Sequence, residues 1–309
     1  MTKGRRTFIK NGMIGAASMM LPSFEFLPQT PPVVSQPGFS LKVMGTKWGN
    51  PDPIDLFCQK VKEEGYDGIE VWWPGEQKDQ EALFEALKKN KLDIGFLCGG
   101  SQADYASHFA SFKSALQAAA FNKFQTPLYI NCHSGRDYFS SGENKTFIDL
   151  TSAVAKESGV RIMHETHRSR MLFAAPVARN YILERPDLRI TLDISHWCNV
   201  SESLLQDQKD TVNMTLQRTD HIHARVGHAE GPQVNDPRAP EWETAVKAHF
   251  DWWDQVVARK KENGEPLTFL TEFGPPHYMP TVPYTNQPVA DQWAINVHMM
   301  QTLRKRYLV

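Results

Sequence analysis

The feature of this sequence that most constrains its fold is a regular alternation of short apolar runs with amphipathic segments. Residues 160–165 read Val-Arg-Ile-Met-His-Glu, an apolar β-like run that ends in ionisable side chains. Runs of the same design occur at 188–193, 220–223 and 267–272. Between them, apolar residues recur at the three- and four-residue spacing of a helix. Strands that alternate with helices in this way predict a parallel sheet.

The number of these units favours a closed barrel over an open, doubly wound sheet. We predict eight strands with their loops, at 40–49, 65–74, 92–98, 128–135, 160–167, 188–196, 220–225 and 267–274. A helix is predicted after each strand, at 53–64, 81–90, 104–124, 145–158, 172–184, 201–218, 241–263 and 289–307. A (β/α)8 barrel takes roughly 250 residues, and the 309 residues here leave about that number after an N-terminal leader. The predicted fold is therefore α/β, a single-domain (β/α)8 TIM barrel over 39–309.

The first 38 residues are predicted to be an export leader that is not part of the barrel. Gly4-Arg5-Arg6-Thr7-Phe8-Ile9-Lys10 precedes a modest apolar segment at 12–21, a pattern typical of a twin-arginine-type signal peptide. Five prolines between 22 and 37 then mark a linker. We expect the protein to be exported by the twin-arginine route to the periplasm or envelope of a bacterium. A basic terminus on a cytosolic protein is the alternative interpretation.

The charge and hydropathy of the remaining chain disfavour two classes of partner. The whole chain has a formal net charge of −1, and residues 1–35 carry four basic and one acidic side chain, which leaves about −4 on the rest. We therefore expect no nucleic-acid partner. No apolar run after the leader is long enough to span a bilayer, so we expect no transmembrane segment. A small-molecule ligand remains as the expected partner.

Four ionisable residues at or near the ends of successive predicted strands form the candidate site: Glu165, Asp193, His223 and Glu272. The carboxyl ends of the strands in a (β/α)8 barrel lie on one face and carry the active site. Three carboxylates and an imidazole suit one divalent ion, with Mn²⁺ as our first expectation and Mg²⁺, Co²⁺ or Zn²⁺ as alternatives.

The four cysteines lie outside this set, which disfavours a structural zinc site. Cys58, Cys98, Cys132 and Cys198 are scattered without paired spacing, and we expect buried thiols. Cys98 and Cys132 end successive predicted strands and are the pair most able to be neighbours. Glu70 is expected inside the barrel, hydrogen-bonded near the site rather than binding the metal.

These residues resemble the xylose isomerase-like TIM barrel superfamily, in particular its sugar phosphate isomerase/epimerase branch with the ketose 3-epimerases. The resemblance covers nearly all of the chain after the leader. It rests on five stretches: Gly65-Tyr66-Asp67-Gly68-Ile69-Glu70, Glu165, Asp193-Ile194-Ser195-His196, His221-Ile222-His223 and Thr271-Glu272-Phe273-Gly274. It implies that Glu165, Asp193, His223 and Glu272 bind one metal ion. It also implies that Glu165 and Glu272 exchange the substrate proton, that His196 contacts the sugar, and that the protein forms a homodimer or homotetramer.

The substrate pocket departs from the pattern of that family. The family carries an arginine several residues after the metal-binding histidine, whereas Arg225 lies two residues after His223 and Ala229 is at the later position. The family also has a second glutamate shortly after the first, where this chain has Met171. The metal site is therefore expected to resemble the family more closely than the substrate pocket does.

Together these features predict a divalent-metal-dependent sugar isomerase or epimerase. A carboxylate would remove a proton next to a carbonyl, and the metal would stabilise the resulting enediolate. The expected substrate contacts are His196, His133, Arg225, His167 and Trp48. Three alternatives remain open: a metal-dependent lyase or hydratase acting on 3-keto-glycosides, an endonuclease IV-like three-zinc phosphodiesterase, and a sugar-binding barrel without activity.

Overall fold

The computed structural model describes residues 38–308, and these form a closed barrel of eight parallel strands in chain order. The strands are β1 Leu41–Thr46, β2 Gly68–Trp72, β3 Asp93–Gly99, β4 Tyr129–His133, β5 Ile162–Glu165, β6 Ile190–Leu192, β7 Thr219–Ala224 and β8 Leu267–Thr271. Pairing of Leu41 with Leu267 through Gly45 with Thr271 closes the barrel between β1 and β8. The predicted fold class is confirmed. The predicted leader falls, apart from Gly38, on residues outside the described part of the chain.

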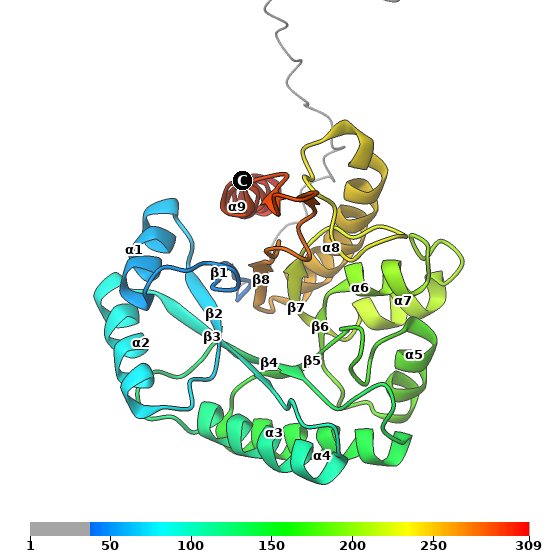
Figure 1. Ribbon diagram of the computed structural model, residues 1–309. Helices are drawn as coiled ribbons and strands as arrows, with labels where there is room; N and C mark the ends of the chain where they lie inside the picture. The colour runs from blue at the N-terminus through cyan, green and yellow to red at the C-terminus, as the bar shows by residue number, and fades with distance from the viewer. Residues whose placement is uncertain (1–37, 309) are drawn as a thin grey trace, which may run out of the picture.

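Helices surround the barrel, with the strands at the centre of the view in Figure 1. They are α1 Ile54–Glu64, α2 Gln77–Asn90, α3 Tyr105–Ala120, α4 Ser141–Ser158, α5 Ala175–Glu184, α6 Ile194–Val200, α7 Lys209–Leu216, α8 Glu243–Asn263 and α9 Gln292–Tyr307. Local sequence defines their ends. In α4, the Ser140 side chain and Glu143 form a reciprocal capping box, and the helix ends at Gly159 in the left-handed conformation, which glycine adopts without strain.

One predicted helix is wrong in its bounds. The segment 201–218 was expected to be a single helix, but α6 begins at Ile194, directly after Asp193, and a turn region separates it from α7. The reason is packing, since Ile194, Trp197 and Cys198 lie at helical spacing and are all buried. Consequently, His196 belongs to a helix at the barrel mouth and not to the end of a strand.

Two apolar clusters support the barrel. The larger lies between the strands and the helices, and it includes the fully buried rings of Phe96, Trp197 and Trp253. The smaller consists of Met44, Tyr129, Met163 and Leu270, all buried. These residues come from strands on different sides of the ring, β1, β4, β5 and β8, so they fill the barrel interior.

The cysteines are as predicted. All four are buried and free, and Cys98 and Cys132 are register partners on β3 and β4.

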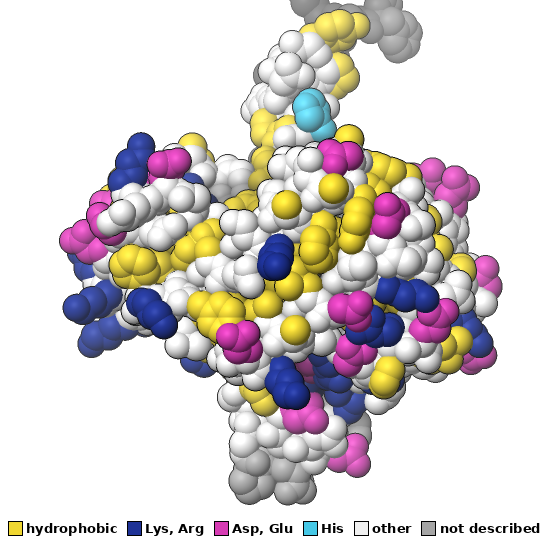
Figure 2. All heavy atoms as spheres, turned by 90° about the horizontal axis from the view of Figure 1, so that it is seen from below, with side chains coloured by type: hydrophobic (Ala, Val, Ile, Leu, Met, Phe, Trp, Pro, Cys, Tyr) yellow, Lys and Arg dark blue, Asp and Glu magenta, His cyan; other side chains and the backbone are white. Residues whose placement is uncertain are grey.

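The distribution of charge on the surface is relevant to the expectation that the protein has no nucleic-acid partner. On the face shown in Figure 2, basic and acidic side chains are interspersed, so this face has no continuous basic surface of the kind that binds nucleic acid. Between residues 38 and 308, none of the helices has the length and apolar character needed to cross a bilayer.

Candidate metal centre and substrate cavity

The structure brings together the four residues of the predicted metal set at the carboxyl end of the barrel. Glu165 is the last residue of β5, Asp193 directly follows β6, His223 lies in β7 and Glu272 directly follows β8. Each offers a ligand atom, and these atoms all lie within 4.8 Å of one another. His223 Nδ1 lies 2.9 Å from Glu272 Oε2 and 3.6 Å from Glu165 Oε1. The convergence follows from parallel strands that end on the same side.

Glu165 presents one satisfied and one free oxygen. Its Oε2 accepts hydrogen bonds from Asn131 Nδ2 at 2.7 Å and from His133 Nε2 at 2.8 Å. Its Oε1 is buried and has no hydrogen-bond partner within the described part of the protein. Burial acts to raise the pKa of this carboxyl, but the neighbouring His133 and His223 hold that pKa well below its ordinary value. Glu165 is therefore an anion with a free oxygen directed at the cluster, as a metal ligand requires.

Arg225 is an internal ion-pair partner of this cluster. Its guanidinium is 1% exposed, and Nη2 donates to Asp193 Oδ2. The same nitrogen lies 2.9 Å from His196 Nε2, and Nη1 lies 3.5 Å from Glu272 Oε2. Arg225 was expected to contact the substrate. It does line the cavity, but most of its polar atoms are already engaged by the protein.

The cluster holds more negative charge than Arg225 alone compensates. Burial raises the pKa of Asp193 to about 7, and Glu272 and Glu165 add to this rise against the opposing effect of Arg225. Burial acts to lower the pKa of His223, but the neighbouring carboxylates of Glu272, Glu165 and Glu70 outweigh it. The pKa of His223 is therefore well above its ordinary value. Buried carboxylates in excess of cations are costly unless neutralised. The donor set and its charge therefore fit a divalent cation.

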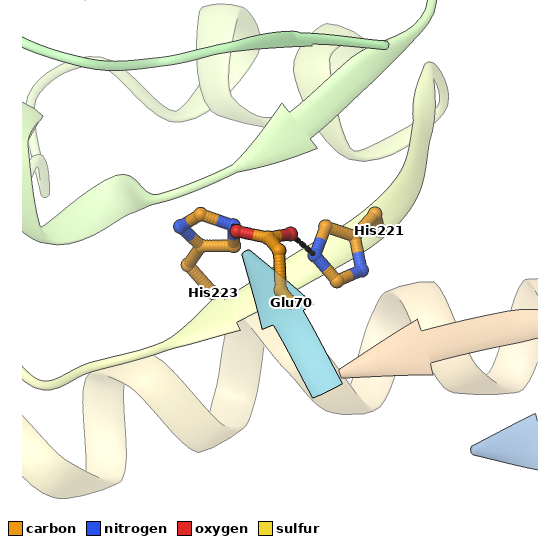
Figure 3. Close-up of side chains that lie close together, drawn as sticks. All are labelled: Glu70, His221 and His223. Carbon is orange, nitrogen blue, oxygen red and sulfur yellow. Dashed lines mark ion pairs between the residues drawn. The ribbon is translucent and has the colours of Figure 1, made fainter. Parts of the chain in front are cut away.

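A further carboxylate lies on the opposite side of His223. Figure 3 shows the carboxylate of Glu70, from β2, between the rings of His221 and His223 from β7. Glu70 Oε2 lies 3.4 Å from His221 Nε2, and Oε1 lies 3.5 Å from His223 Nε2. A carboxylate next to the second nitrogen of a ligand histidine orients the ring. The prediction that Glu70 is an interior residue is confirmed. Its Oε2 has no hydrogen-bond partner among the described residues, and Glu70, His221 and His223 form a second group that could hold a metal ion, so its predicted role outside the metal ligands stays a prediction.

A cavity of about 650 Å³ adjoins the cluster. Of the predicted substrate contacts, Trp48, His133, His167 and Arg225 line it, together with Glu272. His196 is fully buried beside His167, with ring centroids 3.9 Å apart, and does not belong to the cavity wall. Burial and the neighbouring His167 and Arg225 lower the pKa of His196 well below its ordinary value, so its ring is neutral. Among the two predicted catalytic glutamates, Glu272 faces the cavity and Glu165 is enclosed next to it.

Two residues of the site were missed by the sequence analysis. Asn131 donates to Glu165, and it could have been found because it lies two positions before His133 on β4 and so faces the same side. Tyr278 lies in the loop after β8 and lines the cavity, with its ring 4.8 Å from that of Trp48 and 4.9 Å from the Arg225 guanidinium. No local pattern in the sequence predicts that a loop tyrosine returns to the site.

The similarity of this chain to proteins of known structure supports the fold. No protein-family model matches the sequence, and no curated protein does so either. Solved structures do match. The 3-keto-D-glucoside 4-epimerase of E. coli superimposes with a TM-score of 0.58 at 16% identity, covering 86% of this chain and 100% of that one. The chain shares the (β/α)8 barrel fold of this enzyme.

Two further structures agree with this fold. A D-tagatose 3-epimerase-like protein matches with a TM-score of 0.56 at 14% identity, over 86% of this chain and 97% of that one. The probable 3-DHS dehydratase involved in petrobactin synthesis in Bacillus anthracis matches with a TM-score of 0.53 at 17% identity, over 86% of this chain and 100% of that one. At such low identity the likeness establishes the barrel and leaves the chemistry to the site residues.

Proposed function

We propose that this protein is a divalent-metal-dependent sugar isomerase or epimerase. The observation that carries the proposal is the meeting of Glu165, Asp193, His223 and Glu272 within 4.8 Å of one another beside a large cavity. The shared fold of a 3-keto-D-glucoside 4-epimerase and a D-tagatose 3-epimerase-like protein supports it. A sugar with a carbonyl group is the substrate class that this site serves.

The metal would be held by the carboxylates of Glu165, Asp193 and Glu272 and by Nδ1 of His223, which faces two of them. Mn²⁺ is the first choice for such a set, and Mg²⁺, Co²⁺ and Zn²⁺ also accept it. When bound, a divalent ion supplies a Lewis acid that draws negative charge onto the substrate oxygens and stabilises an enediolate.

The protein side chains provide the proton transfers. Glu272 faces the cavity with 12% of its side chain exposed, and it is the base that a bound sugar would meet first. Glu165 is held by Asn131 and His133, so its free oxygen has a defined direction from which a proton could return to the substrate carbon. Removal by one carboxylate and return by the other would invert the carbon centre.

The remaining cavity residues would bind and orient the sugar. Burial and the neighbouring His133 lower the pKa of His167 to about 3, so its ring is neutral and can both donate and accept hydrogen bonds. His133 and His167 lie side by side, with ring centroids 4.7 Å apart. Trp48 offers an aromatic face of the kind that packs against the apolar side of a sugar ring.

A lyase or dehydratase is the second candidate function. The structural match to the probable 3-DHS dehydratase supports it. The same base would remove the same proton, and the electron pair would then expel a leaving group, such as an alkoxide or hydroxide, from the next carbon. The two reactions differ in the substrate and not in the carboxylates, so product analysis separates them.

Metal content together with Glu165→Gln tests the proposal. Protein purified without chelators should contain about one Mn, Co, Mg or Zn ion per chain, and the variant should lose it. The control is Glu157→Gln, which makes the same change at an exposed position on α4. About three zinc ions per chain would instead indicate the nuclease alternative. Absence of metal, even after titration, would refute the metal-dependent mechanism and leave a sugar-binding barrel.

Solvent deuterium exchange provides the second test. Incubation of the metal-loaded protein with ketoses and 3-keto-glycosides in D2O should place deuterium on the carbon next to the carbonyl. Exchange without a new sugar isomer but with release of the leaving group would assign a lyase. No exchange with any substrate of the panel counts against both candidates.

We also propose that residues 1–38 direct export by the twin-arginine route, which is supported by Arg5-Arg6 followed by Phe8 and Lys10. Changing both arginines to lysine should retain the protein in the cytoplasm of a bacterial host, as measured by cell fractionation. Equal amounts in the periplasmic fraction with and without the arginines would contradict this proposal.

A further inference from the structure

The cavity next to the candidate metal centre is larger than a single sugar ring requires. It holds about 650 Å³. A free hexose has twelve non-hydrogen atoms, which at roughly 30 Å³ for each water-sized group displace at most about 360 Å³. A substantial part of the cavity therefore remains when one sugar ring lies at the carboxylates.

The lining of the cavity divides into two chemically different regions. One region is polar and contains Glu272, His133, His167 and Arg225, the residues that surround the candidate metal centre. The other region, which we name the apolar annex, is lined by Ile54, Val71, Pro74, Ala82, Leu83 and Leu97. These residues come from the start of α1, from β2 and the segment after it, from α2 and from β3. Two further charged residues line the cavity: Asp79, which is exposed on α2, and Lys47, whose Nζ donates a hydrogen bond to the carbonyl oxygen of Asn50 at 2.6 Å.

The two regions are joined through β2. Val71 of the apolar annex directly precedes Trp72, and the Trp72 ring packs edge-on against His133 with centroids 5.3 Å apart. Trp72 is 53% exposed and lines the cavity, so a large aromatic surface faces solvent between the polar region and the apolar annex. When a ligand covers exposed apolar surface in a concave site, that surface is removed from water, and this lowers the free energy of the complex.

We propose that the apolar annex binds the uncharged aglycone of a glycoside, with an aromatic ring as the preferred group, while the sugar lies at the carboxylates. This inference rests on the proposed function, because it takes the polar region to be the sugar site. It extends that function by naming the substrate class: a sugar joined to an apolar or aromatic group, and not a free monosaccharide.

Binding of two simple glucosides tests the apolar annex without requiring turnover. Isothermal titration calorimetry on the metal-loaded full chain compares phenyl β-D-glucopyranoside with methyl β-D-glucopyranoside. We expect the phenyl compound to bind at least tenfold more tightly. In Ala82→Glu, which places a charge in the apolar annex from an exposed position of α2, this ratio should fall to near one. Ala110→Glu makes the same change at an exposed position of α3 outside the cavity, and it should keep the ratio.

The outcomes separate this inference from the proposed function. Equal affinities for the two glucosides, or no binding of the phenyl compound at millimolar concentration, overturn the apolar annex even if metal-dependent deuterium exchange is found with a ketose. A phenyl preference that Ala82→Glu leaves intact also overturns it, because the aromatic ring would then bind elsewhere. A phenyl preference abolished by Ala82→Glu in a protein that shows no exchange chemistry would support the apolar annex and refute the isomerase.

Discussion

Replacing Arg225 with methionine tests the electrostatics of the candidate metal centre. The side chain is 1% exposed and its guanidinium is paired with the fully buried Asp193. Methionine keeps most of the volume but leaves the carboxylate without its cation. Loss of one partner of a buried ion pair costs about 3–5 kcal/mol. At about 2–4 °C per kcal/mol for a domain of this size, Tm should fall by roughly 6–20 °C.

The loss should depend on pH with a definite sign. Folding raises the pKa of Asp193 from 3.8 to about 7, and an acid with a raised folded pKa contributes stability that is lost as pH increases through that window. Arg225 opposes this rise in the pKa of Asp193, so its removal extends the window above pH 7. The variant should therefore be destabilised more at pH 8 than at pH 6, where Asp193 can take up a proton.

Thermal unfolding followed by circular dichroism, with chelator and then with excess Mn²⁺, measures both effects. Manganese should raise the Tm of Arg225→Met more than that of the wild type, because the ion replaces the cation that Asp193 has lost in the variant. The control is Arg238→Met, which removes a surface pair with Asp236, with side chains 42% and 24% exposed, and should cost at most about 1 kcal/mol. A Tm change in chelator no larger than that of the control, or a larger loss at pH 6 than at pH 8, would refute this account.

Four further predictions concern other parts of the chain. Glu70→Gln should weaken metal binding about 10–100-fold, because the amide orients His223 less well; unchanged affinity in a metal titration would remove Glu70 from the site. Trp253→Ala should lower the free energy of unfolding by about 3–5 kcal/mol, since the ring is fully buried; a loss below about 1 kcal/mol in urea would contradict the packing. Ser140→Ala should cost about 1 kcal/mol through the lost capping box of α4, and an unchanged urea midpoint would argue against the cap. Reductant should leave Tm unchanged, because Cys98 and Cys132 are free thiols; a drop in Tm would reveal a disulfide.

Much of the architecture is predictable from local sequence. Most strands are short apolar runs and most of the helices carry an apolar stripe, so their number and order predict the barrel. Glu165, Asp193 and Glu272 could be singled out because each ends or directly follows a strand. The prediction failed at α6, where a helix starts directly after Asp193 and carries His196 into the interior. A pattern that serves both as a strand end and as a helix start is ambiguous until its packing partners are known.

Other properties of the site depend on residues that are far apart in the chain. Glu70 reaches His221 across the barrel, and Tyr278 returns to Trp48 from a loop after the last strand. These contacts follow from strand register and from closure of the barrel, which no local segment encodes.

The alternation of strands and helices, and the ionisable side chains at strand ends, can be read from the amino-acid sequence because both depend on neighbours in the chain. Three features emerge only when the chain has folded: Arg225 neutralises Asp193 internally, Glu272 and not Glu165 faces the cavity, and apolar residues line the cavity beside the polar region. Burial and the distance between charges arise when remote segments pack together, and they set the pKa of each group and the shape of the space left for a ligand.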